Sequence, residues 1–589
     1  MLSTQSCSWF GLVFESDSVS RSVQLVQIDR GREQAPLSSP EEAFSIAKDS
    51  IRILIADKLD PAGGEYLAAQ DGVVVTNQTG LGNDELVAAL ADHDGVVVRS
   101  AVKITADLLD AAMTIPGSRL RGIARAGVGV DNINLDSATK YGIAVMNSAS
   151  ASTITTAEHA FALMIALARN IAPASAVMNA GGWDRNKFVG LQLHGRTLGV
   201  VGMGRIGQTM ASRALAFGMK VLGFDPFINA ESALDGQVTM LGSFDDLIAS
   251  VDIVSFHVPR TDQTTGMLSK TQFEKARPGL LVINASRGGI VDEKALIEAL
   301  DAGICAGAAI DVYPTEPPPA DDPLRTHEKV LTTPHLGAST VEAQEAVAVN
   351  ACHALLTYLR GEGLEGAVNV GGLDLALSTR QRAFVDLAER MTLLLQAATN
   401  MQGLKSVRIT LKGETLAGKA DTIARLSLTS ILNRHVEQPV TIINVSMIAE
   451  QRGITHETII ASDIGEDRLA IELTGTDSTP HRVEGAIYDD NLPRVTNLDG
   501  YALDMITSGP MVLLTNADQP GRIGLVGKIF GDAKVNIAEM VIGRKPEDSP
   551  GDVAMMILKL DASPGDDALQ TLREAEGILH VAAVELSRV

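Results

Sequence analysis

The chain has 589 residues and a formal net charge of −23 at pH 7, and this length predicts roughly three to five domains. Its 45% hydrophobic and 21% charged residues are ordinary for globular proteins and sufficient for several cores. The acidic balance argues against a nucleic-acid partner, because binding a phosphate backbone needs a basic surface.

The cysteines Cys7, Cys305 and Cys352 have spacings that match neither a metal site nor a disulfide framework. Free thiols are typical of a reducing cytosol, so a cytoplasmic location is expected. The apolar run at 160–168 is too short to cross a bilayer, which takes about 20 residues, so no membrane association is expected.

Residues 1–50 carry the weakest pattern in the chain. Met1 to Phe14 is rich in serine and has no basic residue, and Glu15 and Asp17 follow. A secretory signal starts with positive charge, and a transit peptide is rich in arginine and poor in acids. A disordered extension, or a misplaced start codon, is therefore favoured over a targeting segment.

From residue 51, short apolar strands alternate with amphipathic helices, which predicts parallel βαβ units. A first series of strands is expected at 51–56, 73–76, 95–98, 120–124 and 143–146. After a helix at 155–168, a second series is expected at 197–201, 220–224, 253–256, 281–284 and 306–310. We predict two doubly wound domains, with the helix at 340–359 returning to the first and the active site in the cleft between them.

The C-terminal part begins after the glycine-rich stretch 361–372, which predicts a linker. A region of mixed helices and strands follows, with strands expected at 407–411 and 469–473. The last elements are expected as strand 511–515, helix 521–530, strands 535–542 and 553–560, helix 567–574 and strand 579–586. This βαββαβ order is ferredoxin-like.

A glycine-rich motif, GMGRIG at 202–207, follows the strand that ends at residue 201 and opens a helix. Gly202 permits the tight turn, Gly204 lets a pyrophosphate approach the backbone, and Gly207 lets helix and strand pack closely. The helix N-terminus then offers free N–H groups to the phosphates. The motif is weak alone, but the strand-to-helix context is the one that dinucleotide binding requires.

The next strand ends at Asp225. A carboxylate there can accept hydrogen bonds from both adenosine ribose hydroxyls and would repel a 2′-phosphate, which predicts NAD over NADP. The alternative is a structural glycine turn followed by an aspartate that caps a helix.

Three polar segments that follow predicted strands each carry one candidate catalytic side chain: Arg287, Glu316 and His335. Singly, each is typical of a surface or structural residue. Together they would serve the oxidation of a 2-hydroxy acid. The arginine offers two donors to the carboxylate and the carbonyl oxygen. The histidine takes the hydroxyl proton as hydride leaves C2, and the glutamate fixes its tautomer and favours the imidazolium form.

The motifs GMGRIG, ASRGGIVDE around Arg287, DVYPTEPP around Glu316 and PHLGAST around His335 resemble the signature of the D-isomer-specific 2-hydroxyacid dehydrogenases. Within that family, RAGVGVDNINL (125–135), GGWDRNKF (181–188) and HLGASTVEAQ (335–344) are similar to the phosphoglycerate dehydrogenase branch. The resemblance covers roughly residues 51–370. It implies a substrate-binding domain at 51–150 plus 332–370 and an NAD-binding Rossmann domain at 151–331.

The resemblance implies that Arg287 binds the substrate carboxylate and keto oxygen, with His335 as the acid/base and Glu316 as its partner. It further implies that NAD is lined by Gly202, Gly204, Arg205, Ile206, Gly207, Asp225, Val258, Ala285, Asp311, Gly337 and Ala338. Val258 departs from the family, where threonine is often found. A side-chain hydrogen bond to NAD would be missing there, although the backbone could still contact the cofactor.

The substrate phosphate needs its own cations. The resemblance implies Arg99, at a strand end of the first domain, and Arg185 and Lys187, in a loop that could reach the phosphate from a partner subunit. The alternative is that all three are ordinary exposed basic residues, which are common.

Residues 510–589 resemble the ACT domain, a regulatory module that binds amino acids across a dimer interface. By this resemblance Asp518 and Asn536 would hold L-serine. Asn516 stands where a serine-inhibited relative would carry an aromatic residue, so a purely structural role in dimerisation is the alternative.

Residues 373–505 resemble the intervening domain of the long phosphoglycerate dehydrogenases, in TIINVSMIAEQRGI (441–454) and GAIYDDNLPRVTNLDGY (485–501). That domain is implied to bind anionic effectors, and the sequence locates no such site.

The prediction is therefore an α/β enzyme with two doubly wound parallel-sheet domains, an α+β intervening domain and a ferredoxin-like ACT domain. It is expected to oxidise 3-phospho-D-glycerate to 3-phosphohydroxypyruvate with NAD, the first step of L-serine biosynthesis, and by resemblance to be a homotetramer. One alternative is another D-2-hydroxy acid, or 2-oxoglutarate, as substrate. The other is an NAD-sensing binding protein without turnover.

Overall fold

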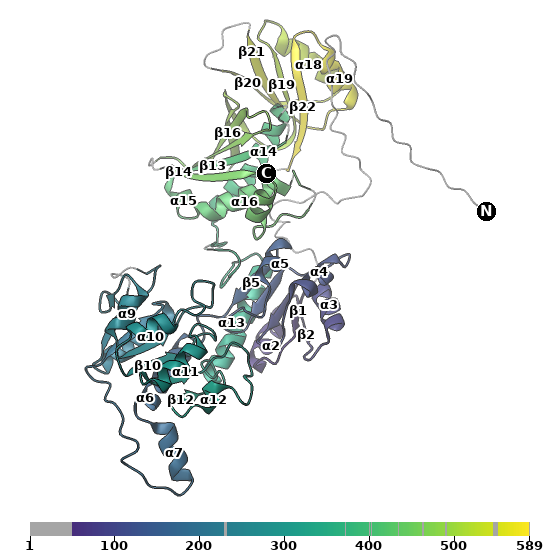
Figure 1. The fold of residues 1–589 in the computed structure, drawn as a ribbon. Coiled ribbons are helices and arrows are strands. Elements are labelled where there is room, and N and C mark those ends of the chain that lie inside the picture. Colours follow the sequence, from purple (N-terminus) through teal and green to yellow (C-terminus); the bar gives the residue numbers. More distant parts are fainter. Residues whose placement is uncertain are drawn as a thin grey trace, which may run out of the picture. The chain divides into compact units, whose positions relative to one another are not determined.

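The computed structural model describes residues 50–587, apart from short gaps at 229–232, 372, 400, 402, 434, 437, 462–464, 489–491 and 546–551. The extension expected at 1–50 lies outside the described residues, except for Ser50, and so does Cys7. Figure 1 shows the chain as a ribbon with its elements labelled.

The first domain is built on a five-stranded parallel sheet of order β2-β1-β3-β4-β5. Its strands are β1 (Ile51–Ile55), β2 (Val73–Asn77), β3 (Gly95–Val98), β4 (Gly122–Arg125) and β5 (Ala144–Asn147). Its helices are α2 (Pro61–Ala68), α3 (Asn83–Asp92), α4 (Ala106–Thr114), α5 (Leu135–Lys140) and the much later α13 (Val341–Leu359). The predicted return of this last helix is confirmed, because α13 packs on α2 and on β3 to β5.

The second domain has a seven-stranded parallel sheet of order β12-β11-β10-β9-β6-β7-β8. The strands are β6 (Thr197–Val201), β7 (Lys220–Phe224), β8 (Thr239–Met240), β9 (Ile253–Phe256), β10 (Leu280–Asn284), β11 (Cys305–Ile310) and β12 (Val330–Thr332). The helices are α8 (Arg205–Ala216), α9 (Phe244–Ser250), α10 (Lys270–Lys275), α11 (Glu293–Asp301) and α12 (Pro323–Thr326). The edge strands β8 and β12 were not predicted, because with two and three residues they are too short to give a clear strand pattern.

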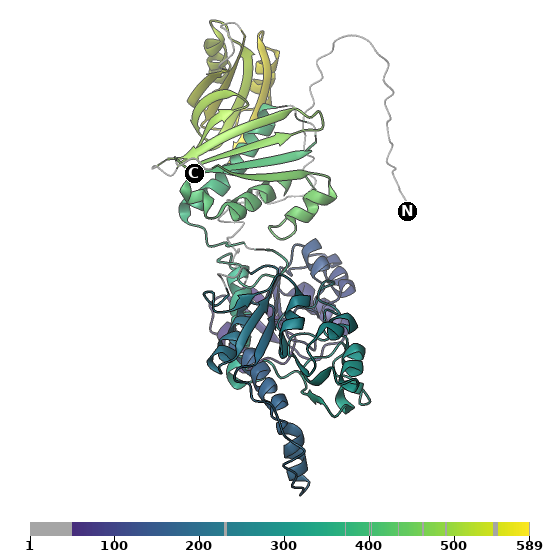
Figure 2. The ribbon, with the colours of Figure 1, turned by 60° about the vertical axis from the view of Figure 1, so that its left-hand side comes forward.

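Helices α6 (Thr153–Ala168) and α7 (Ile171–Asn179) meet at Asn170, whose φ of 50° lies in the left-handed region. Helix α7 stands out from its own domain (Figure 2), and none of its residues is buried. Among the described residues no single helix is long and apolar enough to span a bilayer, although α6 and α7, bent by 66°, pass that test as a pair.

The intervening region forms a six-stranded sheet of order β14-β13-β15-β16-β17-β18, parallel only between β13 and β14. Its strands are β13 (Ser406–Lys412), β14 (Thr455–Ala461), β15 (Arg468–Thr474), β16 (Pro480–Ile487), β17 (Pro493–Leu498) and β18 (Tyr501–Ile506). The strands predicted at 407–411 and 469–473 are each one residue longer at both ends. The helices are α14 (Thr379–Ala398), α15 (Glu414–Ala417), α16 (Ala420–Asn433) and α17 (Val445–Gln451).

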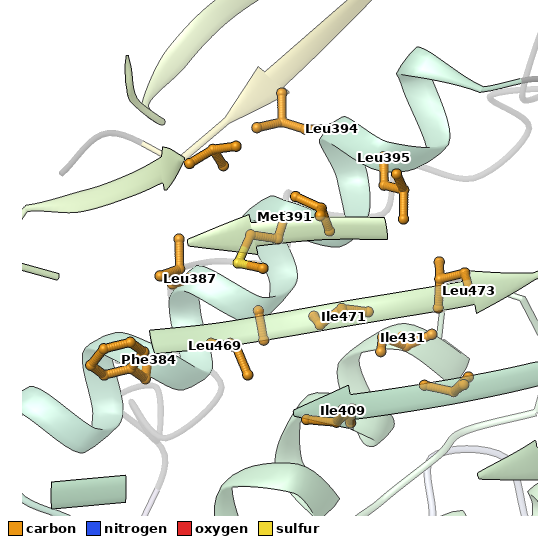
Figure 3. Close-up of a cluster of buried hydrophobic side chains, with 14 of the residues drawn as sticks. Phe384, Leu387, Met391, Leu394, Leu395, Ile409, Ile431, Leu469, Ile471 and Leu473 are labelled. Atoms are coloured by element: carbon orange, nitrogen blue, oxygen red, sulfur yellow. The ribbon is translucent and has the colours of Figure 1, made fainter. Parts of the chain in front are cut away.

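Helix α14 is the centre of this region's core. Figure 3 shows Phe384, Leu387 and Met391 of α14 among side chains of β13, α16 and β15. A capping box fixes the start of the helix: Ser378 accepts from the N–H of Gln381, whose side chain accepts from the N–H of Ser378.

The last domain has the predicted ferredoxin-like order, with an antiparallel sheet β20-β21-β19-β22. Its elements are β19 (Gly509–Ala517), α18 (Arg522–Asp532), β20 (Ile537–Arg544), β21 (Val553–Leu560), α19 (Asp566–Glu574) and β22 (Ile578–Leu586). Along β19, Met511 and Leu513 join the core around α14, whereas Val512 and Leu514 join the core beneath α18 and α19. Alternate residues of a strand face opposite sides, so the intervening and ferredoxin-like regions share one apolar core.

Candidate active site

In each parallel sheet the order of the strands reverses at one point, and ligands of such folds bind at the carboxyl ends of the strands there. In the first sheet this point lies between β1 and β3, and in the second between β6 and β9. The predicted site residues follow these strands or their neighbours: Arg99 follows β3, Gly202 follows β6, Arg287 follows β10, Asp311 follows β11 and His335 follows β12.

The glycines of the nucleotide motif differ in what surrounds them. A Cβ on Gly202, whose φ is 89°, would lie 2.5 Å from the carbonyl oxygen of His257, and one on Gly207 would overlap the carbonyl oxygen of Gly202. Next to Gly204, in contrast, a Cβ would meet nothing within 4 Å. The backbone is therefore tightly folded on the protein side and open at Gly204, as a loop that receives a pyrophosphate must be.

Asp225 supports the same loop from the end of β7. One carboxylate oxygen accepts the N–H of Met203 at 2.9 Å and the other accepts the N–H of Phe227 at 2.8 Å. Each oxygen keeps a further lone pair, so these bonds leave acceptors for ribose hydroxyls. Beneath the loop, burial lowers the pKa of His257 to about 4, so this ring is neutral and contacts the Ser255 hydroxyl over 2.9 Å.

The structure brings His335 and Glu316 together. Nδ1 of His335 lies 2.7 Å from Oε2 of Glu316, and Oε1 of Glu316 accepts the N–H of Tyr313 at 3.1 Å. Burial alone would raise the pKa of Glu316, but the hydrogen bond and charge of His335 hold it below its ordinary value. The carboxylate therefore stays ionised and Nδ1 carries the proton, which leaves Nε2 for a substrate.

Asp311 organises the loop that carries His335. Its fully buried carboxylate accepts the Thr333 hydroxyl at 2.6 Å and the N–H groups of Leu336 and Gly337 at 2.8 and 3.0 Å. Behind it, Nε2 of His159 on α6 lies 3.1 Å away. From the sequence, Asp311 was predicted to line the cofactor. Its support of the His335 loop was not predicted.

Arg287 meets the first domain through Asp131. Its Nε donates to Oδ2 of Asp131 over 3.0 Å, and its Nη1 donates to the carbonyl oxygen of Ser286 over 2.6 Å. The next residue, Gly288, lies so close to the Tyr313–Pro314 peptide that any Cβ would overlap it. This contact joins the Arg287 loop to the segment that carries Glu316.

A third arginine, Arg125, was missed by sequence reasoning. It ends β4, its guanidinium lies against Gly127, and its Nε is buried without a hydrogen-bond partner in the described part of the chain. Burial, followed by the positive charges of Arg287 and Arg99, lowers the pKa of Arg125 to about 10. The motif RAGVG at a strand end was the available signal, because glycines let the backbone next to the arginine approach a ligand closely.

The loop after β3 places Arg99 beside this cluster. The Asp57 carboxylate accepts the N–H groups of Arg99, Ala101 and Val102 at 3.0–3.2 Å. The guanidinium groups of Arg99 and Arg287 therefore both lie near enough for their charges to act on Arg125. Such a cluster suits a substrate with more than one negative charge.

The other two basic residues predicted for the substrate phosphate, and the two residues predicted for an effector, lie elsewhere. Arg185 and Lys187 are exposed on the loop after α7, next to Trp183 and Val189, whose exposed fractions are 77% and 80%. In the last domain Arg544 binds Asp518, with Nε and Oδ2 2.7 Å apart. The Asn536 side chain donates to Asp561 over 2.7 Å.

Comparison with known proteins places this geometry among dehydrogenases. Residues 161–337 match the model of the D-isomer specific 2-hydroxyacid dehydrogenase NAD binding domain, and residues 380–499 match that of the D-3-phosphoglycerate dehydrogenase intervening domain. A D-3-phosphoglycerate dehydrogenase of Archaeoglobus fulgidus is 36% identical over 91% of this chain and 100% of its own length. One from Bacillus subtilis is 36% identical over 91% of this chain and 99% of its own.

Among solved structures, a glyoxylate reductase from Paecilomyes thermophila superposes with a TM-score of 0.50 at 27% identity. The match covers 54% of this chain and 98% of the reductase.

Proposed function

Because the chain belongs to the D-3-phosphoglycerate dehydrogenase family, we propose that it oxidises the C2 hydroxyl of 3-phospho-D-glycerate to the ketone of 3-phosphohydroxypyruvate. The reaction is the entry step of L-serine biosynthesis and uses NAD as hydride acceptor. The observation that carries the proposal is the His335–Glu316 pair together with Arg287, Arg125 and Arg99. The loop of Arg287 touches the segment that carries Glu316.

His335 is the acid/base in this proposal. With Nδ1 held by Glu316 at 2.7 Å, Nε2 accepts the proton of the C2 hydroxyl, and the ionised Glu316 stabilises the imidazolium that forms. In the reverse direction Nε2 returns the proton to the oxygen of the reduced ketone.

The arginines bind and orient the substrate. Arg287 donates to the carboxylate and to the oxygen on C2, on which charge develops. Arg125 and Arg99, on the first domain, supply the charge that a phosphate requires. With its carboxylate bound by Arg287 and its phosphate by Arg125 and Arg99, the substrate would present one face of C2 to the cofactor.

NAD supplies the hydride acceptor at C4 of its nicotinamide. The open space beside Gly204 and the N-terminus of α8 fit its pyrophosphate, and Asp225 fits its adenosine ribose. Arg205, Ile206, Val258, Ala285, Gly337 and Ala338 complete the proposed lining.

The test is steady-state NADH formation from 3-phospho-D-glycerate beside D-glycerate, D-lactate and D-2-hydroxyglutarate. We expect a clear preference for the phosphorylated acid. Replacing Arg99 by alanine should raise the KM for 3-phospho-D-glycerate more than that for D-glycerate. If the unphosphorylated acids react better, the substrate is another 2-hydroxy acid, and the family assignment stands.

A single variant separates an enzyme from an NAD-sensing protein. His335→Asn removes the proton acceptor, so an enzyme should lose turnover by about two to four orders of magnitude. Binding of NADH, measured by its fluorescence, should be unchanged. Residual turnover near the wild-type rate would argue against His335 as the base.

We further propose that residues 510–589 sense L-serine through Asp518 and Asn536, and that the protein is a cytoplasmic homotetramer. The exposed apolar residues around α7 support association, through which Arg185 and Lys187 could approach a partner's phosphate site. Serine added to the activity assay tests whether residues 510–589 sense L-serine. Sedimentation of the wild type and of the single alanine variants of Arg185 and Lys187 tests the oligomeric state.

A further inference from the structure

Asp131 has no role in the mechanism so far, although its carboxylate binds the arginine that contacts the substrate. It lies in the loop after β4, and Oδ2 accepts from Nε of Arg287 over 3.0 Å. The pairing joins residues separated by 156 positions. It is also an ion pair between the first domain and the second.

The bond uses one specific edge of the guanidinium. Nε is bound by Asp131 and Nη1 by the carbonyl oxygen of Ser286, so the orientation of the planar group is fixed by two acceptors. Nη2 lies against Gly129, where a Cβ would overlap it. Gly129 and Asp131 belong to the same loop, so this loop both approaches the guanidinium and orients it.

Asp131 and its acidic neighbour Asp57 differ in what their carboxylates bind. The carboxylate of Asp57 is occupied by backbone N–H groups of the loop after β3. Asp131 instead binds the guanidinium of Arg287, whereas both carboxylates act through space on Arg125. The Asp131 side chain is 54% exposed against 23% for Arg287, so it is the outer member of the pair.

We propose that Asp131 is a positioning residue, which orients Arg287 so that its Nη groups meet the carboxylate and C2 oxygen of the substrate. This inference rests on the proposed function, because it names the residue that sets the geometry of the proposed substrate arginine. An arginine freed from Asp131 would keep its charge and lose its fixed direction, and orientation is what a two-pronged contact requires.

The experiment compares Asp131→Asn and Asp131→Ala with the wild-type enzyme. The alanine variant should raise the KM for 3-phospho-D-glycerate about tenfold or more and lower kcat as well, because Arg287 also meets the reacting oxygen. The asparagine variant keeps an oxygen acceptor and should fall between. The NADH dissociation constant and the thermal midpoint should stay unchanged, whereas a structural defect would change both.

The matched control is Asp136→Asn, a change at an exposed acid in the first turn of α5, which should leave all parameters unchanged. Wild-type kinetics in Asp131→Ala would overturn the inference. A lower KM would also overturn it, since Asp131 would then compete with the substrate for Arg287.

A second measurement tests the role of Asp131 independently of the proposed reaction. Oxalate binding to the enzyme–NADH complex, measured by calorimetry, needs no turnover and reports on anion binding at the site. If the wild type oxidises none of the four acids, the proposed function fails. Weaker oxalate binding in Asp131→Ala would still support the role of Asp131, and equal binding would overturn it.

Discussion

The carbonyl oxygen of Asp311 accepts the backbone N–H of His335 over 2.9 Å, while the carboxylate of the same aspartate accepts the N–H groups of the two residues that follow. His335 itself has a φ of 56°, in the left-handed region that a residue with a side chain rarely adopts. One buried residue thus holds the backbone of the proposed base in a conformation that costs free energy.

Asp311→Asn should therefore impair catalysis although Asp311 lies behind the proposed base. The amide has one oxygen where the carboxylate has two, so a donor of the His335 loop loses its acceptor, and each such bond to a charged group is worth about 1.5–3 kcal/mol. We expect kcat to fall by roughly an order of magnitude or more and the thermal midpoint to fall by about 3–12 °C, because about 1 kcal/mol shifts the midpoint of a domain of this size by about 2–4 °C. Differential scanning calorimetry and initial rates measure both.

The same residue gives a pH dependence of stability. Burial would raise the pKa of Asp311, but hydrogen bonds from His159, Thr333 and the Leu336 N–H hold it below 3.8. A lowered folded-state pKa means that the contribution to stability is complete above the unfolded value and is lost as pH falls through the folded one. The difference in thermal midpoint between wild type and Asp311→Asn should therefore be constant above about pH 5 and shrink below pH 3.8. A difference that grows on acidification would contradict the assignment.

Glu316→Gln tests the charge behind the proposed base. The glutamine can still accept from Nδ1 of His335, so the ring keeps its tautomer, but the negative charge that favours the imidazolium is gone. Reduction of 3-phosphohydroxypyruvate needs the protonated ring and oxidation needs the neutral ring. At neutral pH we expect kcat for reduction to fall at least several-fold more than kcat for oxidation. Equal losses in both directions would point to displaced geometry instead.

Much of the fold could be predicted from the sequence because its signals are local. The strands 95–98, 197–201, 220–224, 253–256 and 553–560 have the predicted limits, because apolar residues predominate in each. The pairing of His335 with Glu316 was also expected, from motifs whose spacing carried the resemblance.

What the sequence could not predict depends on distant contacts. Asp131 is an ordinary aspartate in a loop until the fold brings Arg287 to it, and Asp311 supports His335 through bonds that form only when β11 and β12 are adjacent. The shared core of the last two regions was missed for a related reason. The unbroken apolar run from Met511 to Leu514 indicates that β19 is covered on both faces, but not which helices cover each face.

Asp225 gives a prediction on cofactor choice. Asp225→Ser removes the carboxylate that can accept the ribose hydroxyls, and with it the repulsion of a 2′-phosphate. We expect kcat/KM for NAD to fall about tenfold to a hundredfold, as the loss of a hydrogen bond to a charged group requires, while that for NADP rises. Part of the loss will come from the Met203 N–H, which Asp225 also binds. The measurement is the rate with each cofactor at saturating substrate. An unchanged ratio of kcat/KM for NAD to kcat/KM for NADP would exclude Asp225 from the ribose site.

Gly288→Ala tests whether the Arg287 and Glu316 loops must touch. An added Cβ would overlap the backbone of Tyr313 and Pro314, which cannot move aside as a flexible side chain could. Either the Arg287 loop or the segment leading to Glu316 must shift, and a shift of about 1 Å can cost a hundredfold in rate. We therefore expect kcat/KM for 3-phospho-D-glycerate to fall by about two orders of magnitude, with NADH binding largely kept. The control is Gly242→Ala in the same domain, where a Cβ would meet nothing within 4 Å. Full activity in Gly288→Ala would mean that the two loops are positioned independently, and Glu316 would then owe its place beside His335 to its own segment alone.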